Sequence, residues 1–341
     1  MAYSVINKSS DYQNTVLYTG DGSGATVSGV GFQPDLNWTK SRSNALNHAL
    51  TDAVRGVQKT LYTNLTAEQD DVTNGLTAFN SDGYVHGDHS LWATDTATYA
   101  SWNWKAGGAG SANTDGSISS TVSVNTTAGF SIVKYTGTGS ADTIGHGLGA
   151  VPKMIISKRL DTTSYWITYH EAIGNDKEIY LNDTSAAAAA ANTWNSTTPT
   201  SSVWSVKTDS NNTSGGSFIS YVFADVAGYS KFGSYIGNSS TNGPFVYTGF
   251  RPSFLICKAT SGGEGWVLFD NKRLGYNVDN NYLNPNSNAA EATSDDVDLL
   301  SNGFKFRTLG SHVNASGITS YIYMAFGQPI ISNGGVSATA R

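Results

Sequence analysis

Alternation of hydrophobic and polar residues predicts strands along the whole chain. Residues 130–135 and 304–307 alternate apolar and polar side chains, as expected of strands with one buried face. Residues 154–156, 165–167 and 321–326 are almost continuously apolar, which favours central strands covered on both faces. Asp-Gly and Asn-Gly pairs predict turns at 21–22, 74–75, 82–83, 115–116, 242–243 and 302–303. The pattern is typical of antiparallel sandwiches or jelly rolls.

Helical signals are few and short. Residues 66–71 and 288–291 could each form a single turn with a polar cap. The six alanines at 186–191 predict a surface turn or a short helix, because six residues do not nucleate a helix alone. The small residues of 106–117 predict a flexible linker.

One signature occurs three times along the chain. A glycine-containing turn ends in a proline, and a lysine follows six residues later, giving the pairs Pro34 and Lys40, Pro152 and Lys158, and Pro252 and Lys258. The chain has only seven prolines, so this shared spacing indicates internal repetition. The first repeat continues with Asp52 and Arg55 and the third with Asp270 and Arg273, whereas the second has His170 in this region.

The repeats predict the domain organisation. We expect an N-terminal arm at 1–13, a first β repeat at 14–105, a Gly/Ser-rich linker and strand at 106–129, a second repeat at 130–229, a third at 230–328 and a C-terminal tail at 329–341. Repeats of about a hundred residues have the size of small domains rather than of solenoid units. The predicted fold class is all-β, with three homologous antiparallel β-sandwich or jelly-roll repeats.

Composition excludes several classes of protein. The net charge is −6 without a basic stripe, which argues against nucleic-acid binding. No run of eighteen apolar residues is present, so no membrane span is expected. The first eight residues do not resemble a secretory signal, so we expect synthesis in a cytoplasm. The single Cys257 cannot form an internal disulfide and is expected on a buried strand.

Searches for catalytic and cofactor chemistry find little. Residues 145–149 resemble a dinucleotide fingerprint, but no helix pattern follows, so a turn is expected. His86, Asp88 and His89 could bind a metal, and 295–298 resembles part of a calcium loop; a solvated loop and a polar turn are the preferred interpretations. Glu68 and Glu291 each stand alone, whereas a glycosidase needs two facing carboxyls. We therefore predict no cofactor, no metal and no enzymatic activity.

Two sets of repeated or clustered residues have both a structural and a functional interpretation. Each signature lysine is expected to pack its stem over an aromatic ring or to pair with Asp52 or Asp270. Three tryptophans could stack on sugar rings and are candidates for glycan contact: Trp92, Trp102 and Trp104. Trp102 and Trp104 share one face of a predicted strand, which favours a place in the core.

Longer motifs give the chain a family resemblance. They are the stretches 18–23, 29–35, 38–42, 52–56, 79–84, 102–108, 228–235 and 243–252, together with 6–12 at the start. In the first repeat they read Tyr-Thr-Gly-Asp-Gly-Ser, Gly-Val-Gly-Phe-Gln-Pro-Asp and Trp-Asn-Trp-Lys-Ala-Gly-Gly, among others. Over nearly its whole length the chain resembles an uncharacterised repeat family of tailed, mostly marine, bacteriophages. Members are labelled tail or virion structural proteins, sometimes lectin-like, and no catalytic residue is established for them.

The resemblance implies a virion structural protein that is made in the host cytoplasm. The leading expectation is a tail-associated fibre or spike protein that contacts a host-surface glycan. One alternative is a capsid decoration protein, and another is a polysaccharide-degrading enzyme. Other virion proteins are the expected partners, together with further copies of the chain in a homo-oligomer, most simply a trimer.

Overall fold

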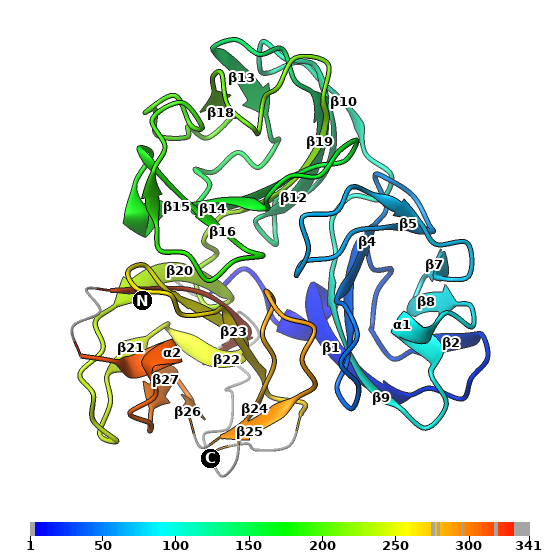
Figure 1. The fold of residues 1–341 in the computed structure, drawn as a ribbon, viewed down its shortest axis with the longest axis vertical. Helices are drawn as coiled ribbons and strands as arrows, with labels where there is room; N and C mark the ends of the chain where they lie inside the picture. The colour runs from blue at the N-terminus through cyan, green and yellow to red at the C-terminus, as the bar shows by residue number, and fades with distance from the viewer. Residues whose placement is uncertain (1–3, 274–276, 278–279, 295, 317–319, 331–341) are drawn as a thin grey trace.

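Three groups of strands surround a common centre in the computed structural model, which describes residues 4–273, 277, 280–294, 296–316 and 320–330. Figure 1 looks down the shortest axis, with the first repeat in blue and cyan, the second in green, and the third in yellow and orange. The chain visits the three groups in sequence order, so each group is a continuous segment. None of the helices in these described ranges has the length and apolar character needed to cross a membrane.

In the first repeat a four-stranded main sheet backs a three-stranded outer sheet. The main sheet has the order β1 (Gln13–Thr19), β9 (Thr98–Trp104), β3 (Leu36–Ser41) and β4 (Ala49–Asp52). The outer sheet has the order β2 (Ala25–Ser28), β8 (Gly83–His86) and β7 (Leu76–Asn80). Smaller elements are η1 (Ser9–Asp11), the paired β5 (Lys59–Thr60) and β6 (Asp70–Asp71), and α1 (Ser90–Ala93).

The second repeat has a longer sheet. Its order is β10 (Ser111–Asn113), β11 (Ser120–Asn125), β12 (Phe130–Thr136), β19 (Ser217–Phe223), β14 (Met154–Arg159), β15 (Ile167–His170), β16 (Lys177–Tyr180) and β17 (Ala188–Ala189). The outer pair is β13 (Asp142–Gly145) and β18 (Val203–Val206), and η2 (Glu171–Ile173) follows β15.

The third repeat returns to the plan of the first. The main sheet has the order β20 (Ser230–Tyr235), β28 (Tyr321–Pro329), β22 (Phe250–Ala259) and β23 (Val267–Asp270). The outer sheet has the order β21 (Phe245–Tyr247), β27 (Gly303–Phe306) and β26 (Val297–Leu300). The remaining elements are the pair β24 (Asn280–Tyr282) and β25 (Ala292–Ser294), and α2 (Ser311–Asn314).

Strand pairing gives equivalent positions in the three main sheets. The orders β1-β9-β3-β4, β12-β19-β14-β15 and β20-β28-β22-β23 are the same topology. Leu36 pairs with Trp104 and Asp52, just as Phe254 pairs with Phe326 and Asp270. Met154 takes this place in the second repeat, where it pairs with Phe223 and His170. The expected all-β sandwich fold is confirmed.

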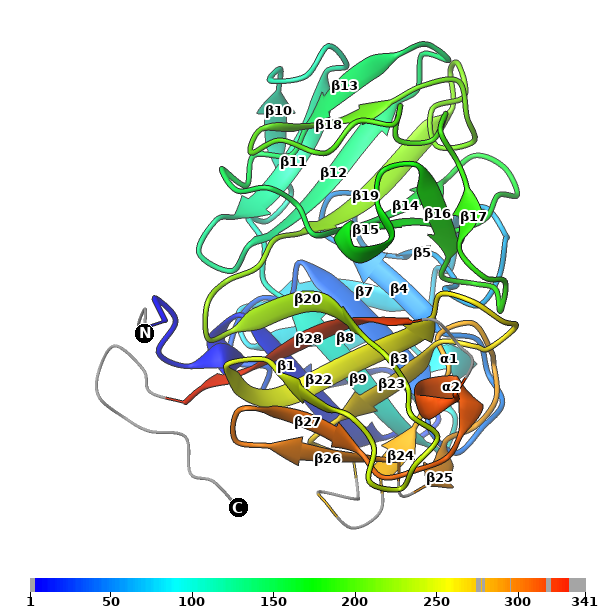
Figure 2. The ribbon, with the colours of Figure 1, turned by 90° about the vertical axis from the view of Figure 1, so that its left-hand side faces the viewer.

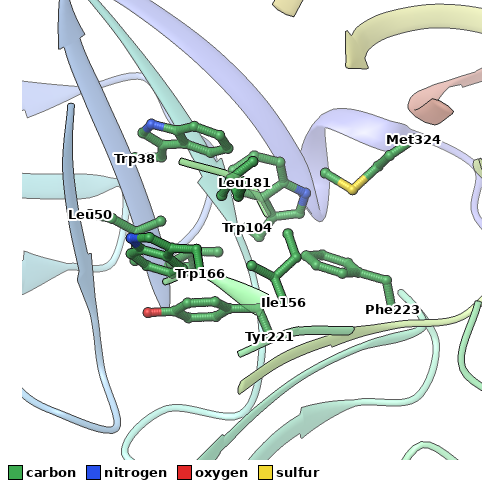
Figure 3. A pocket seen from close by; sticks show the side chains of 10 residues that line it. Trp38, Leu50, Trp104, Ile156, Trp166, Leu181, Tyr221, Phe223 and Met324 are labelled. Atoms are coloured by element: carbon green, nitrogen blue, oxygen red, sulfur yellow. The ribbon is translucent and has the colours of Figure 1, made fainter. Parts of the chain in front are cut away.

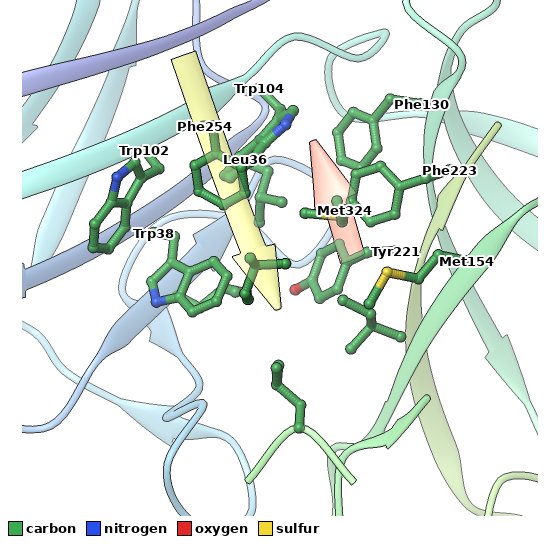
Figure 4. Close-up of a cluster of buried hydrophobic side chains, with 14 of the residues drawn as sticks. Leu36, Trp38, Trp102, Trp104, Phe130, Met154, Tyr221, Phe223, Phe254 and Met324 are labelled. Carbon is green, nitrogen blue, oxygen red and sulfur yellow. The ribbon is translucent and has the colours of Figure 1, made fainter. Parts of the chain in front are cut away.

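Each main sheet lies between the shared centre and its own outer sheet; the side view in Figure 2 shows this for the third repeat, where β26 and β27 lie below β22 and β28. Along β3, Leu36 and Trp38 belong to a core cluster that contains residues of all three repeats. We call this cluster the central core; Figure 4 shows its aromatic rings converging from the three main sheets. The opposite faces form separate cores: Leu255 and Cys257 of β22, for example, pack with Phe304 and Phe306 of the outer sheet. Both faces of a main sheet are therefore buried, which explains the continuous apolar runs at 154–156 and 321–326. The run at 165–167 is not such a strand, because β15 begins only at Ile167 and Tyr165 is exposed.

Several local expectations are wrong. The alanine run contains strand β17 rather than a helix, and residues 66–69 and 288–291 are not helical. The stretch 106–117 includes strand β10, which pairs with β11, so it is not simply a linker. In the alanine run, pairing of β17 with β16 and a hydrogen bond from the Ala187 amide to the Thr260 carbonyl replace local helical bonds. Tertiary hydrogen bonding overrides the high helix propensity of alanine here.

Candidate functional site

The signature prolines lie at matching places at the beginning of equivalent strands. Pro34 and Pro152 each stand two residues before the first residue of β3 and β14. Pro252 lies within β22, and the strand register shifts between Pro252 and Phe254. A proline has no N–H to donate, so it is tolerated at a strand start or a bulge but not in a regular ladder.

The signature lysines lie at the junctions between repeats. Lys40, Lys158 and Lys258 are at most 1% exposed. The Lys158 ammonium donates to the carbonyl of Thr66 in the first repeat at 3.2 Å, and Lys258 donates to that of Thr184 in the second at 3.0 Å. Burial lowers the pKa of each of the three amines to about 8.

The expected pairing of these lysines with Asp52 or Asp270 is wrong. Each ammonium donates to backbone carbonyls: Lys40, for instance, donates to those of Ser41 and Asn44, at 2.5 and 3.1 Å. Asp52 and Asp270 pair instead with the nearby arginines of their own repeats. The lysines therefore hydrogen-bond to backbone carbonyls rather than forming ion pairs. Lys158 and Lys258 do so across a junction between repeats.

A second set of side chains repeats at the same junctions. The ring N–H of Trp166 donates to the carbonyl of Tyr62 at 2.9 Å, and that of Trp266 donates to Tyr180 at 2.8 Å. His48 takes the equivalent place in the first repeat, where its Nε2 lies 3.0 Å from the Asn284 carbonyl. Trp38 donates to His48 Nδ1, so Nε2 carries the proton and donates. Burial holds the pKa of His48 well below its ordinary value, so the ring is neutral.

Backbone hydrogen bonds close the ring of three repeats. The amides of Gln69, Ala187 and Glu291 donate to the carbonyls of Leu160, Thr260 and Arg42, at 2.9, 2.9 and 2.7 Å respectively. Each bond joins a different pair of repeats, and each acceptor follows a signature lysine by two residues. The three junctions are thus built from equivalent positions, and the third one returns from the third repeat to the first.

Two of the junctions contain a buried Asp–Arg pair. Arg55 Nε donates to Asp52 at 2.5 Å, and Arg273 Nε donates to Asp270 at 2.7 Å, with all four side chains at most 1% exposed. The neighbouring repeat adds a donor to each carboxylate: Tyr221 to Asp52 at 2.8 Å and Trp102 to Asp270 at 2.9 Å. Burial opposes ionisation of Asp270, but Arg273 and these hydrogen bonds outweigh it and hold its pKa below the ordinary value.

The second repeat replaces this pair with a histidine. His170 stands at the register position that Asp52 and Asp270 occupy in the other two repeats. Met324 of the third repeat occupies the strand position that is Trp102 in the first repeat and Tyr221 in the second. The amide of Ala172 donates to His170 Nδ1, so Nε2 carries the proton toward the Tyr323 carbonyl at 3.2 Å. Burial lowers the pKa of His170 to about 4, which keeps it neutral. Where Met324 replaces the donor side chain of Trp102 or Tyr221, a neutral histidine therefore replaces the charged carboxylate.

The candidate glycan-contact tryptophans lie inside the protein. Trp92 and Trp102 are fully buried, and Trp104 is 1% exposed. Trp102 and Trp104 belong to the central core, whereas Trp92 packs in the outer core of the first repeat. A buried ring cannot present its face to a sugar, so these three residues are corrected to core positions.

A small cavity lies in the central core (Figure 3). Its volume is about 20 Å³, and residues from all three repeats line it: Leu36, Trp38, Leu50, Trp104, Ile156, Trp166, Leu181, Tyr221, Phe223 and Met324. Space of this size admits one water, but a water needs polar partners, and this lining is apolar. We interpret the cavity as a dry packing defect at the point where the three sheets meet.

The histidines and described aspartates proposed as metal ligands have other partners, except Asp88, which is exposed. His86 Nδ1 donates to the Gly87 carbonyl, while His89 Nδ1 accepts from the amide of Leu91 at the start of α1. Asp296 pairs with His312, and Asp298 pairs with Arg307. Asp295 lies outside the described residues. Within the described ranges, no three His, Cys, Asp or Glu side chains come together.

The remaining single candidates are structural. Glu291 binds Arg42 at 2.8 Å and Arg273 at 3.1 Å, across the junction of the third and first repeats. By the backbone hydrogen bonds at the junctions, the residue of the first repeat that is equivalent to Glu291 is Gln69, not Glu68. Cys257 is buried as expected, and burial raises the pKa of its thiol far above the ordinary value.

Sequence reasoning missed two exposed aromatic surfaces. Tyr165 is 46% exposed and stacks on Tyr180, with ring centroids 4.6 Å apart. Phe245 and Tyr247, at alternate positions of β21, are 46% and 52% exposed. β21 lies at the edge of its sheet. The alternation at 245–247 could have indicated a shared face, but not that this face is outward.

Comparison with known proteins assigns the family. The chain belongs to the family described as Domain of unknown function (DUF7483), whose family model matches residues 8–329. This match spans all three repeats and the ring of junctions between them. Neither the comparison with curated proteins nor that with solved structures gives a match.

Proposed function

We propose that this protein is a structural component of a bacteriophage particle, associated with the tail as part of a fibre or spike. The motif resemblance supports the phage context. The observation that carries the structural role is the closed ring of three sandwich repeats, in which an equivalent backbone hydrogen bond recurs at each junction. Such a ring resists separation of its parts without disulfides, as suits a protein that is made in a cytoplasm and later faces the medium.

Surface contact with a host glycan is the second part of the proposal. Aromatic faces suit the CH-rich faces of sugar rings. With the three tryptophans buried, the exposed rings that the described residues offer for this contact are Tyr165, Phe245 and Tyr247. Tyr247 is also held by Lys231, whose ammonium lies 5.5 Å from the ring centroid and donates to the Tyr247 carbonyl.

The proposed partners are other virion proteins and further copies of the chain. Strands that are apolar on both faces need covering, which further copies of the chain in a trimer would provide. In the structure one chain covers both faces by placing its three main sheets around a shared core. The proposed homo-oligomer therefore rests on the resemblance alone.

The test of the structural role is localisation on intact particles. We expect peptides of this chain in purified phage particles and antibody-gold label at the tail. Label on the head would instead support the capsid decoration alternative. Detection only in the soluble fraction of infected cells, with none in particles, would contradict a virion role.

We also propose that the chain does not hydrolyse polysaccharide. Glu178 and Asp209 lie close together, but both are hydrogen-bonded to the same hydroxyl, Thr193 Oγ1, at 2.7 and 2.8 Å. A glycosidase holds its carboxyls on either side of the scissile bond. We therefore expect no new reducing ends when the protein is incubated with host exopolysaccharide. Turnover that Glu178→Gln abolishes, with Glu68→Gln unaffected, would contradict this proposal.

A further inference from the structure

Two carboxylates of the second repeat converge on one threonine hydroxyl. Glu178 of β16 lies 2.7 Å from Thr193 Oγ1, and Asp209 of the loop after β18 lies 2.8 Å from the same oxygen. Glu178 is 7% exposed, and its other oxygen accepts from the Tyr180 hydroxyl at 2.5 Å. The site lies beside the outer core of the second repeat, where Trp194 follows Thr193.

The hydrogen bonds of this group leave negative charge unbalanced. A threonine hydroxyl has one proton, so it donates to only one of the two carboxylates at a time. Among the described residues, no salt bridge involves Glu178 or Asp209. Lys177 precedes Glu178 on the strand and points to the opposite face. Two neighbouring carboxylates in a largely buried place need a positive charge to be stable.

Asn211, which contacts Thr193, carries a buried amide oxygen without a partner in the described part of the chain. Asn211 is fully buried, and its side-chain nitrogen donates to the carbonyl of Thr193 at 3.0 Å. Its Oδ1 has no hydrogen-bond partner within the described part of the chain. Leaving such an atom unpaired costs about 1–3 kcal/mol.

The matching position in the third repeat is apolar, so the asparagine is particular to the second. Tyr135 donates to the Asn211 carbonyl at 2.7 Å, just as Tyr235 donates to that of Val313 at 2.9 Å. Asn212 and Asn314, one residue later, also make corresponding side-chain bonds. The fold therefore does not require an amide at position 211. Its polar oxygen is available for a ligand that the third repeat does not bind.

We infer that Glu178, Thr193, Asp209 and Asn211 form a binding site for Ca²⁺. All four side chains offer oxygen, the ligand that hard cations prefer, and calcium tolerates irregular geometry. Nitrogen and sulfur ligands, which zinc and copper favour, do not take part. With two carboxylates only, and water completing the coordination, the expected Kd is on the order of 10⁻⁴ to 10⁻³ M, as in extracellular calcium modules.

Terbium luminescence tests this site directly, because Tb³⁺ replaces Ca²⁺ and is excited by a nearby aromatic ring. Trp194 and Tyr180 are adjacent to the proposed ligands. We expect sensitised emission that millimolar Ca²⁺ displaces, and apparent binding at least tenfold weaker in Glu178→Gln and Asp209→Asn. Asp176→Asn is the matched control: this exposed carboxylate precedes the same strand, and its removal should leave emission unchanged.

Asn211→Val tests the site independently of whether the carboxylate variants fold. Because valine occupies the matching place in the third repeat, this variant should keep the native circular dichroism spectrum while losing Tb³⁺ emission. Full emission in Asn211→Val, or in both carboxylate variants, would overturn the assignment. Absence of any Ca²⁺-displaceable emission from the unmodified protein would overturn it as well.

Discussion

Replacing Asp52 with asparagine is expected to lower the free energy of unfolding by about 3–5 kcal/mol. Arg55 and Asp52 are both buried, and Asp52 is the only carboxylate that Arg55 contacts in the described part of the chain. The substitution leaves a buried guanidinium without its counter-charge. It also weakens the bond from Tyr221, which joins the second repeat to the first. Urea unfolding followed by tryptophan fluorescence measures the loss.

Two matched variants give this prediction its control. Asp71→Asn removes an exposed pair with Lys59 and should cost less than about 1 kcal/mol. Asp270→Asn should cost less than Asp52→Asn, because Arg273 keeps Glu291 at 3.1 Å. An equal cost for Asp52→Asn and Asp71→Asn would show that the buried pair contributes no more than a surface one.

Replacing Trp104 with alanine is expected to cost about 3–5 kcal/mol as well, but for a different reason. The ring is 1% exposed and packs edge-on against Phe254 and Phe326 of the third repeat, with centroids 5.2 and 6.0 Å apart. Its removal enlarges the small cavity of the central core, where three sheets already meet imperfectly. The loss should therefore affect the ring of repeats as a whole, and denaturant unfolding should remain a single transition at a lower midpoint.

Phe245→Ala is the control for this prediction. Phe245 is also aromatic but is 46% exposed on the edge strand β21, so its removal opens no internal cavity. We expect a change within about 0.5 kcal/mol. If Trp104→Ala were as mild as Phe245→Ala, the central core would not be what holds the three repeats together.

Much of the fold follows from local sequence pattern. The continuous apolar run at 321–326 lies in β28, which is buried on both faces. Residues 130–135 form the expected strand, β12, although it is buried on both faces rather than on one. These predictions succeed because side chains in a strand alternate with a period of two, whatever the rest of the chain does. The recurring proline-to-lysine spacing likewise marks equivalent strand positions, because it counts residues within one strand and the turn before it.

Local pattern fails where a residue's partner comes from another repeat. The sequence predicts that Lys158 packs over an aromatic ring or pairs with an aspartate. In the structure its ammonium donates a hydrogen bond to the carbonyl of Thr66 in the first repeat. The alanine run was expected to be helical or a turn, but β16 and the Thr260 carbonyl hold it extended. No periodicity within a window of ten residues contains information about a partner a hundred residues away.

The sequence by itself therefore determined the strand class, the turns and the threefold recurrence of positions. Tertiary structure alone decided that the three main sheets share one core, which buries Trp102 and Trp104 and rules them out as glycan contacts. It also brought Glu178, Thr193, Asp209 and Asn211 together from a strand and two loops. The physical reason is that strand formation depends on neighbours along the chain, whereas a junction or a binding site depends on which loops the closed ring places side by side.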